Sequence, residues 1–208
     1  MGERKSFYVT LPSNACHDIY PENNNSDFTI SLSQPIELIG EYEVALAEIS
    51  YTNSTYNIYS LEDSYDVLDK DQPSLPPIYQ KIKTGKYDSV EKLVDAMNDG
   101  FTTTGLDIQL VYSDVKKRVC FDGSERYSLK VQAPMAYMLG FKPDEWYSVW
   151  KNVYAPLPPD IKAGQYHFMV YTNIIEAQHV GEFLVPLLRT VKFSGEYGDQ
   201  VIIQGIVL

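Results

Sequence analysis

Cysteine is scarce in this chain of 208 residues, which carries only Cys16 and Cys120. Two distant cysteines do not predict a disulfide framework, and a chain of this length can bury a sufficient core without one. No apolar run approaches the roughly 20 residues that cross a bilayer, and the first residues lack the apolar stretch of a secretory signal. We therefore expect a fold without disulfides, a reducing compartment and no membrane partner.

Basic charge is also in short supply, because 17 lysines and arginines stand against 28 aspartates and glutamates, a net charge of −11. Binding to a phosphate backbone draws its affinity from basic side chains that release counterions, so this balance opposes a nucleic-acid partner. The one basic cluster is Lys116, Lys117 and Arg118, between two β-like runs. We interpret it as a hairpin turn kept soluble by its charge.

Catalytic and phosphate-binding motifs are missing from the sequence. It contains no G-x-S-x-G, no G-x-G-x-x-G and no P-loop pattern. Cys16, His17 and Asp18 resemble a fragment of a metal site, but no second group has a suitable spacing for zinc. Asp69 and Asp71 lack the Gly and Glu of a calcium loop, so we expect solvated charge there. The sequence predicts no cofactor, no metal and no enzyme.

Strand-type patterns are what the chain has in abundance, together with 17 tyrosines, a residue that suits strands and interfaces. In residues 28–33, Phe28, Ile30 and Leu32 alternate with polar side chains, and a second alternating run covers residues 44–51. Pro35 and Gly40 bracket the turn between the runs. This segment predicts two antiparallel strands.

Further strands and two helices are predicted along the chain. Residues 106–112, 118–121 and 126–131 are expected to form a meander. A helix should begin at a cap at Asp88 or Ser89 and end at Gly100, and a short helix over 133–139 should end at Gly140. The remaining expected strands are residues 7–11, 65–68, 78–83, 166–172, 191–193 and 201–208. The whole pattern predicts an all-β fold, an antiparallel β-sandwich that forms a single domain over residues 1–208, with one packed helix and a long excursion at 52–77.

Several phrases resemble a known family when they are taken in order. These are FYVTLPSN, FTISLSQPIEL and EYEVALAEISY, then a capped helix after KTGKYDS, the AYMLGF segment, and finally HFMVYTNIIEAQHVGEFLVPLLRTV. Together they look like the penton, or minor capsid, protein of Polinton (Maverick) elements and related viruses. The motif positions, which we expect to be structural, are Phe7, Tyr8, Pro12, Glu48, Tyr51, Gly181, Pro186 and Arg189.

The resemblance implies a single jelly roll that forms homopentamers at the five-fold vertices of an icosahedral capsid. It also implies contact with a major capsid protein of double jelly-roll fold, and a location in the virion capsid after assembly in the host cell. Family members continue past the position of Leu208. Either this is a shorter version, or residues 201–208 take the place of a terminal strand; a missing strand would leave an open sheet edge for a neighbour.

A second hypothesis is a jelly-roll or sandwich module that recognises a receptor or glycan through its long loops. Trp146, Tyr147 and Trp150 would then stack on sugars. We expect these three side chains instead to be buried across the end of the sandwich.

Overall fold

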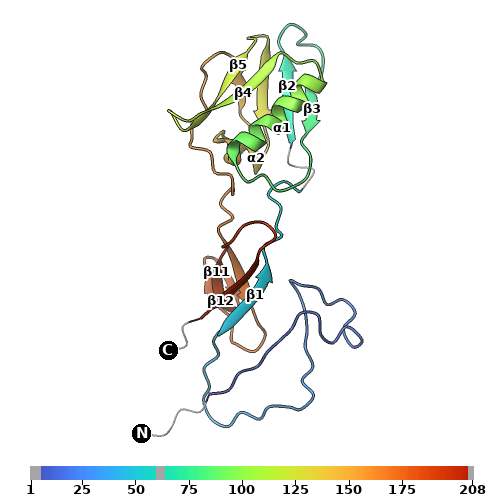
Figure 1. The fold of residues 1–208 in the computed structure, drawn as a ribbon, viewed down its shortest axis with the longest axis vertical. Helices are drawn as coiled ribbons and strands as arrows, with labels where there is room; N and C mark the ends of the chain where they lie inside the picture. Colours follow the sequence, from blue (N-terminus) through green and yellow to red (C-terminus); the bar gives the residue numbers. More distant parts are fainter. Residues whose placement is uncertain (1–5, 60–63, 206–208) are drawn as a thin grey trace. The chain divides into compact units, whose positions relative to one another are not determined.

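The computed structural model describes residues 6–59 and 64–205. The chain forms two compact units, Met1–Glu43 and Val44–Leu208. Among the described residues, all twelve strands and both helices belong to the second unit (Figure 1). Every paired strand is antiparallel to its neighbour, so the predicted all-β, antiparallel class is confirmed.

The first unit contains turns and extended chain but no strand in its described part, residues 6–43. The strands predicted for residues 7–11 and 28–33 are therefore wrong. Asparagine side chains bind the backbone here: Asn23 Oδ1 accepts from the Thr29 N–H at 2.8 Å, and Asn24 Oδ1 accepts from the Asp27 N–H at 3.0 Å. Such local bonds compete with the hydrogen bonds of a strand ladder. An alternation of apolar and polar residues does not by itself supply a partner strand for that ladder.

A four-stranded sheet forms the centre of the second unit, in the order β3 (Ile78–Lys81), β2 (Ser64–Asp69), β6 (Tyr127–Val131), β7 (Trp146–Ser148). The predicted strands at 65–68 and 78–83 are confirmed in essence. Strand β7, which has only three residues, was not predicted. The long excursion predicted at residues 52–77 contains β2, which is an inner strand of this sheet.

A hairpin of β4 (Ile108–Ser113) and β5 (Arg118–Gly123) lies beside the sheet. The basic turn is confirmed, since Lys117 adopts φ +50 and its ammonium lies 3.2 Å from a carboxylate oxygen of Asp114. The expected meander is wrong at its third strand. Strand β6 pairs with β2 and β7 and not with β5. In a meander, β5 would pair with the edge of β6 that β2 occupies here.

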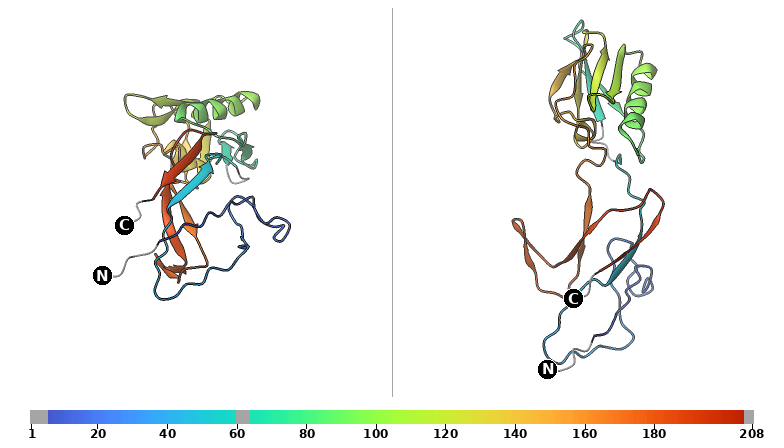
Figure 2. Two further views of the ribbon diagram at one scale, coloured as in Figure 1. Left: turned by 60° about the horizontal axis from the view of Figure 1, so that its bottom comes forward. Right: turned by 60° about the vertical axis from the view of Figure 1, so that its left-hand side comes forward.

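Helix α1 (Val90–Thr103) lies against the strands of the central body, as Figure 2 shows, and its apolar residues Leu93, Val94, Met97 and Phe101 are buried. The Ser89 side chain accepts from the Lys92 N–H at 3.3 Å, which confirms the predicted cap. The second helix, α2 (Met135–Leu139), ends at Gly140 with φ +84, also as predicted. The core that these elements share is formed by residues between Ile58 and Ala163; its largest fully buried side chains include Tyr65, Phe101, Phe121 and Phe141. We call this part, residues 57–163, the central body.

Asn57 closes the central body at the place where the chain first reaches it. Its side chain is almost fully buried; Nδ2 donates to the carbonyl oxygens of Tyr87 and Ile161, each at 2.9 Å, and Oδ1 accepts from the Tyr87 N–H at 2.9 Å. Three bonds satisfy this buried amide. They hold the beginning of the body, at 57, beside its end, at 161.

Among the described residues, the rest of the second unit contains three two-stranded sheets, of which one is a short hairpin over residues 178–185 that is described below. Strand β1 (Glu48–Thr52) pairs with β12 (Gln200–Gln204), and β8 (His167–Tyr171) pairs with β11 (Leu187–Lys192). We call these four strands the two-sheet region. The strands expected at 44–51, 166–172, 191–193 and 201–208 are thus found with changed ends, although residues 206–208 lie outside the described chain.

Gly100 does not end helix α1, contrary to expectation, because the helix continues to Thr103. The reason for a glycine is steric. A Cβ at this position would lie 2.5 Å from the hydroxyl oxygen of Tyr65, which is buried and has no hydrogen-bond partner among the described residues. The aromatic ring of Tyr65 packs edge-on against Phe101 at 5.1 Å, so it has little room to move.

We predict that Gly100→Ala lowers the free energy of unfolding by about 1–3 kcal/mol, although alanine normally favours a helix. Adding Tyr65→Phe should restore most of the loss, since it removes the clashing and unpartnered hydroxyl. Urea denaturation followed by circular dichroism measures both. Gly85→Ala is the matched control, because a Cβ there meets nothing within 4 Å. A double variant as unstable as Gly100→Ala would contradict the steric account.

A second prediction follows from the pKa of Tyr65, which burial raises to about 12. Below pH 10 both the folded and unfolded states keep the phenol proton, whereas above it the unfolded state releases the proton first. Stability should therefore fall from about pH 10 to about pH 12. Tyr65→Phe should lose less stability over this range, and Tyr137→Phe, at an exposed position, should behave as the wild type. Equal slopes for all three proteins in chemical denaturation would contradict this.

Candidate assembly surface

The predicted motif VGEFLVPLLR begins with a tight hairpin. Strands β9 (Gln178–Val180) and β10 (Phe183–Val185) pair so that only Gly181 and Glu182 lie between them. Gly181 has φ +61 while Glu182 keeps a negative φ, the arrangement typical of a type II′ turn. The need for a left-handed residue at the first turn position explains this glycine.

Pro186 separates β10 from β11 in the second half of the motif. Because proline has no N–H, it cannot donate to a ladder, and β11 begins after it with an irregular register between Leu187 and Arg189. The Pro186 carbonyl is still used, accepting from the Thr172 N–H at 3.1 Å. The Gln178 side chain donates to the Leu187 carbonyl, which ties the hairpin to β11.

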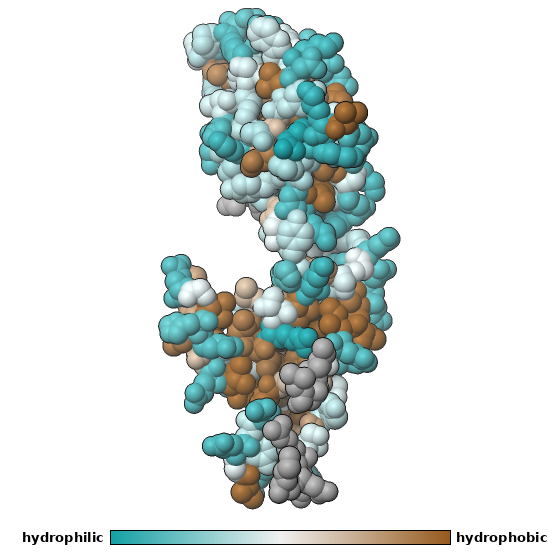
Figure 3. Space-filling model, turned by 90° about the vertical axis from the view of Figure 1, so that its left-hand side faces the viewer, coloured by the Kyte–Doolittle hydropathy of each residue, from teal (hydrophilic) through white to brown (hydrophobic). Residues whose placement is uncertain are grey.

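Large apolar side chains project from this hairpin and from the outer face of β8. Phe183 is 66% exposed and Leu184 61% exposed, and Met169 and Tyr171 are about half exposed. A groove runs between them, lined by Met169, Tyr171, Val180, Gly181, Glu182, Phe183 and Val185. Figure 3 shows hydrophobic residues gathered on this face. We call the residues that line this groove, together with Leu184 on the opposite face of β10, the hairpin surface. Exposed apolar area of this kind marks interaction sites.

An aromatic cluster holds the two-sheet region together behind the hairpin surface. The Tyr51 ring on β1 lies 5.0 Å from Phe168 on β8, edge to face, and Phe168 lies 5.2 Å from Phe193. Val191 and Val201 are buried beside these rings. Such pairs add about 0.5–1.5 kcal/mol each beyond the area they bury. The same cluster directs Met169 and Tyr171 outward, because alternate residues of β8 face opposite sides.

Arg189 makes a polar link between β11 and the chain that leads into β1. Its guanidinium donates to the Leu46 carbonyl at 3.2 Å, and the Gly205 N–H donates to the neighbouring Ala47 carbonyl at 2.6 Å. A Cβ at Gly205 would collide with both the Leu46 carbonyl and the guanidinium. Glu48 is the first residue of β1 and is exposed. Gln204 lies opposite it on β12, and Gln204 Nε2 donates to Glu48 Oε2 at 3.4 Å.

The structure brings five of the eight motif residues into this part of the second unit. Glu48, Tyr51 and Arg189 belong to the two-sheet region, and Gly181 and Pro186 shape the hairpin surface. The other three lie in the first unit: Phe7 and Tyr8 are exposed there, and the Pro12 carbonyl accepts from the Ala15 N–H. All eight are expected to be structural, and that expectation stays a prediction.

Sequence reasoning missed the residues that give the hairpin surface its character. Phe183 and Leu184 entered the sequence analysis only as part of the last phrase that carries the family resemblance. The period of β8 could have identified Met169 and Tyr171 as one face, but not which face is exposed. That depends on Phe168, whose partners Tyr51 and Phe193 are far from it in sequence.

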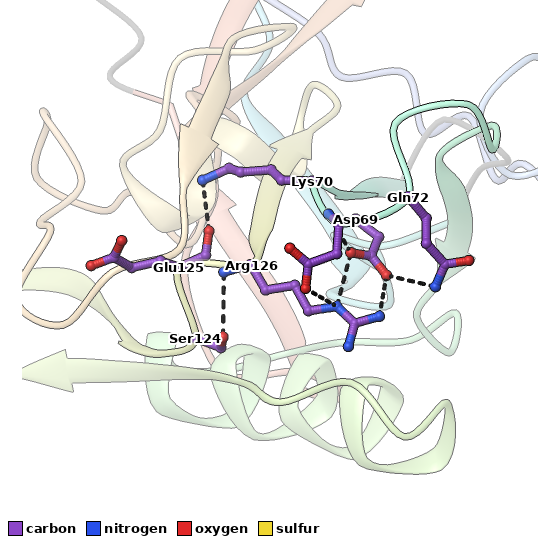
Figure 4. Close-up of polar contacts among 7 residues, drawn as sticks. Asp69, Lys70, Gln72, Ser124, Glu125 and Arg126 are labelled. Carbon is purple, nitrogen blue, oxygen red and sulfur yellow. Dashed lines mark hydrogen bonds and ion pairs between the residues drawn. The ribbon is translucent and has the colours of Figure 1, made fainter.

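The charged residues at one end of the central sheet form a structural clamp. Arg126 donates from Nε to Asp69 Oδ1 at 2.8 Å and from a terminal nitrogen to Oδ2 at 2.5 Å, and it lies 3.4 Å from Asp71 (Figure 4). The Arg126 hydrogen bond lowers the pKa of Asp69. These aspartates were expected to be solvated, which is wrong for Asp69, whose side chain is 14% exposed. The pairing joins the end of β2, and the turn that follows it, to the turn before β6.

The exposure of the tryptophans corrects another expectation. Trp146 is 43% exposed and Trp150 is 52% exposed, so neither is buried across an end of the fold. Only Tyr147 packs inward, with its ring 4.9 Å from Phe141. Within residues 6–59 and 64–205, no cluster of three or more His, Cys, Asp and Glu side chains is suited to a metal ion. No helix there has the length and apolar character needed to cross a membrane.

Comparison with known proteins gives no relative: no family model, no curated protein and no solved structure matches this chain. The surface and the sequence motifs therefore carry the functional argument.

We predict that Tyr51→Ala loosens the two-sheet region and leaves the central body folded. The substitution removes the ring that joins β1 to Phe168, so amides of β8 and β11 should exchange hydrogen at least about tenfold faster. Amides of α1 and β6 should keep their protection. Tyr171→Ala, on the outer face of β8, is the matched control. Unchanged protection of β8 and β11 in Tyr51→Ala, measured by mass spectrometry, would contradict this role of the cluster.

Proposed function

We propose that this chain is a non-enzymatic structural protein of a capsid, a penton subunit that forms homopentamers at five-fold vertices. The observation that carries the proposal is the hairpin surface, where Phe183 and Leu184 stand more than half exposed beside an apolar groove. A solvated monomer gains nothing from such side chains, whereas a subunit interface buries them.

Open strand edges support the same assignment. In the described chain each sheet of the two-sheet region has two strands, so each of the four strands has one unpaired edge. Isolated two-stranded sheets are marginally stable, and native monomers avoid leaving strand edges unprotected. A jelly roll, which the sequence resemblance implies, has four strands in each sheet. The two facing pairs are suited to be the inner part of such a sandwich.

Five-fold assembly needs two different patches on each subunit, because a cyclic ring is built head to tail. The apolar hairpin surface supplies one patch. The acidic balance of the chain, with its net charge of −11, fits a role in the shell better than contact with a genome. The resemblance names the further partner, a major capsid protein of double jelly-roll fold, which would surround the vertex.

The assembly prediction is that the purified chain forms a species of five times its own mass, alone or when mixed with its major capsid protein. Phe183→Asp combined with Leu184→Asp should reduce association at least about tenfold, because it places charge in the interface. Val115→Asp is the control, since Val115 is 95% exposed at the tip of the β4–β5 hairpin. Light scattering and negative-stain imaging measure the result.

Two outcomes would reject the proposal. One is a wild-type monomer at high micromolar concentration with no affinity for the major capsid protein. The other is a double variant that folds and assembles as the wild type does, which would remove the hairpin surface from the interface.

A further inference from the structure

The four strands of the central sheet place four side chains in one row. Asp66 on β2 lies opposite Tyr79 on β3 and opposite Lys130 on β6, and Lys130 lies opposite Trp146 on β7. Directly opposed residues project from the same face of a sheet. Tyr79 and Trp146 therefore stand at the two ends of a row whose middle is an acid and a base.

This row lies on the face opposite the core. The intervening residues Tyr65, Val67 and Leu129 are fully buried, and Tyr65 contacts Phe101 of α1. Since α1 packs on that inner face, it does not cover the outer face. Tyr79 is 51% exposed and Trp146 is 43% exposed on the outer face.

The polar middle of the row is held in a fixed geometry. Lys130 Nζ lies 3.0 Å from Asp66 Oδ2, and the two side chains are only 23% and 17% exposed. Gln132 Nε2 donates to the same Asp66 oxygen at 3.2 Å, and Lys130 Nζ lies 5.1 Å from the Trp146 ring centre. A partly buried group held by these contacts loses little conformational entropy when a ligand binds, and its remaining hydrogen-bonding capacity is directed to the surface.

A shallow depression adjoins the Tyr79 end of the row. It is lined by Ser64, Tyr79, Gln132, Ala133 and Asp144, which supply a hydroxyl, an amide and a carboxylate beside the ring. The three gaps between four strands make the row roughly 14 Å long. The surface thus offers two aromatic rings at its ends and closely spaced hydrogen-bond donors and acceptors between them.

We propose that this row, Tyr79–Asp66–Lys130–Trp146, binds a linear oligosaccharide of neutral sugars. Pyranose rings have apolar C–H faces that pack on aromatic rings and hydroxyls at their edges that bond to carboxylate, amide and ammonium groups. The opposite charges of Asp66 and Lys130 cancel within the row. At its Tyr79 end the Asp144 carboxylate is balanced by Lys81, whose Nζ lies 5.6 Å from the Tyr79 ring centre, so the surface has no excess charge to select an anionic chain. A shallow open surface suits an extended ligand better than a compact one, which needs an enclosing pocket. This binding site is independent of the hairpin surface and of assembly.

The test is binding of the full chain to an array of defined linear oligosaccharides of neutral sugars, followed by titration of the best one against tryptophan fluorescence. Trp146→Ala and Tyr79→Ala should each weaken binding at least about tenfold, which equals about 1.4 kcal/mol. Trp146→Phe and Tyr79→Phe keep a ring and should retain most of the affinity. Trp150→Ala is the matched control, being a tryptophan 52% exposed outside the row.

Thermal unfolding of each variant distinguishes a lost contact from a lost fold. Binding by the wild type and by Trp150→Ala, with loss in the two ring-to-alanine variants at unchanged unfolding temperature, would support the site. The proposal is overturned if the wild type binds no oligosaccharide on the array, if Trp146→Ala binds as the wild type does, or if Trp150→Ala loses binding equally. The proposal is also overturned if the row Tyr79–Asp66–Lys130–Trp146 binds the major capsid protein and binds no sugar.

Discussion

The buried amide of Asn57 is the constraint on which the organisation of the second unit depends. By bonding to both Tyr87 and Ile161, it fixes the first residue of the central body beside its last turn. A body whose two ends meet can be inserted into another fold without stretching the host, which is how domain insertions are tolerated. The core residues from Ile58 to Ala163 then pack among themselves, as an inserted unit requires.

The two parts of the second unit have very different amounts of stabilising contact. The central body encloses fully buried rings such as Phe101 and Phe121 under a helix and several strands. The two-sheet region relies on the half-buried ring of Tyr51, its neighbours Phe168 and Phe193, and the Arg189 link. Local stability depends on the number of buried contacts, so the two-sheet region, which has open strand edges, is also the less stable part. A subunit that gains its remaining contacts on assembly would show this asymmetry.

Local chemistry was predictable from the sequence, and long-range pairing was not. The Ser89 cap, the left-handed Gly140 and the basic turn at Lys117 each depend on a few neighbouring residues, and all three were predicted. Gly100 was interpreted as a helix end because the sequence cannot show Tyr65 lying against it. For the same reason, alternation identified β6 as a strand but could not reveal that β2, far earlier in the chain, takes its edge. At the candidate surface the motif glycine and proline were found, whereas the exposure of Met169 and Tyr171 depends on the aromatic cluster behind β8.

The first unit shows what alternation means when no ladder forms. Phe28 and Leu32 have the period of a half-buried strand, yet both are exposed and their backbone joins no sheet. A segment whose local pattern conflicts with its surroundings is unusual in a native fold, where local and global preferences agree. The conflict disappears if such a segment finds a partner strand that the isolated subunit does not supply. Exposed strand patterns here, unpaired edges in the two-sheet region and an apolar hairpin surface are three separate signs of incompleteness. A protein that completes itself by joining neighbours in a shell, as proposed, accounts for all three with one physical cause.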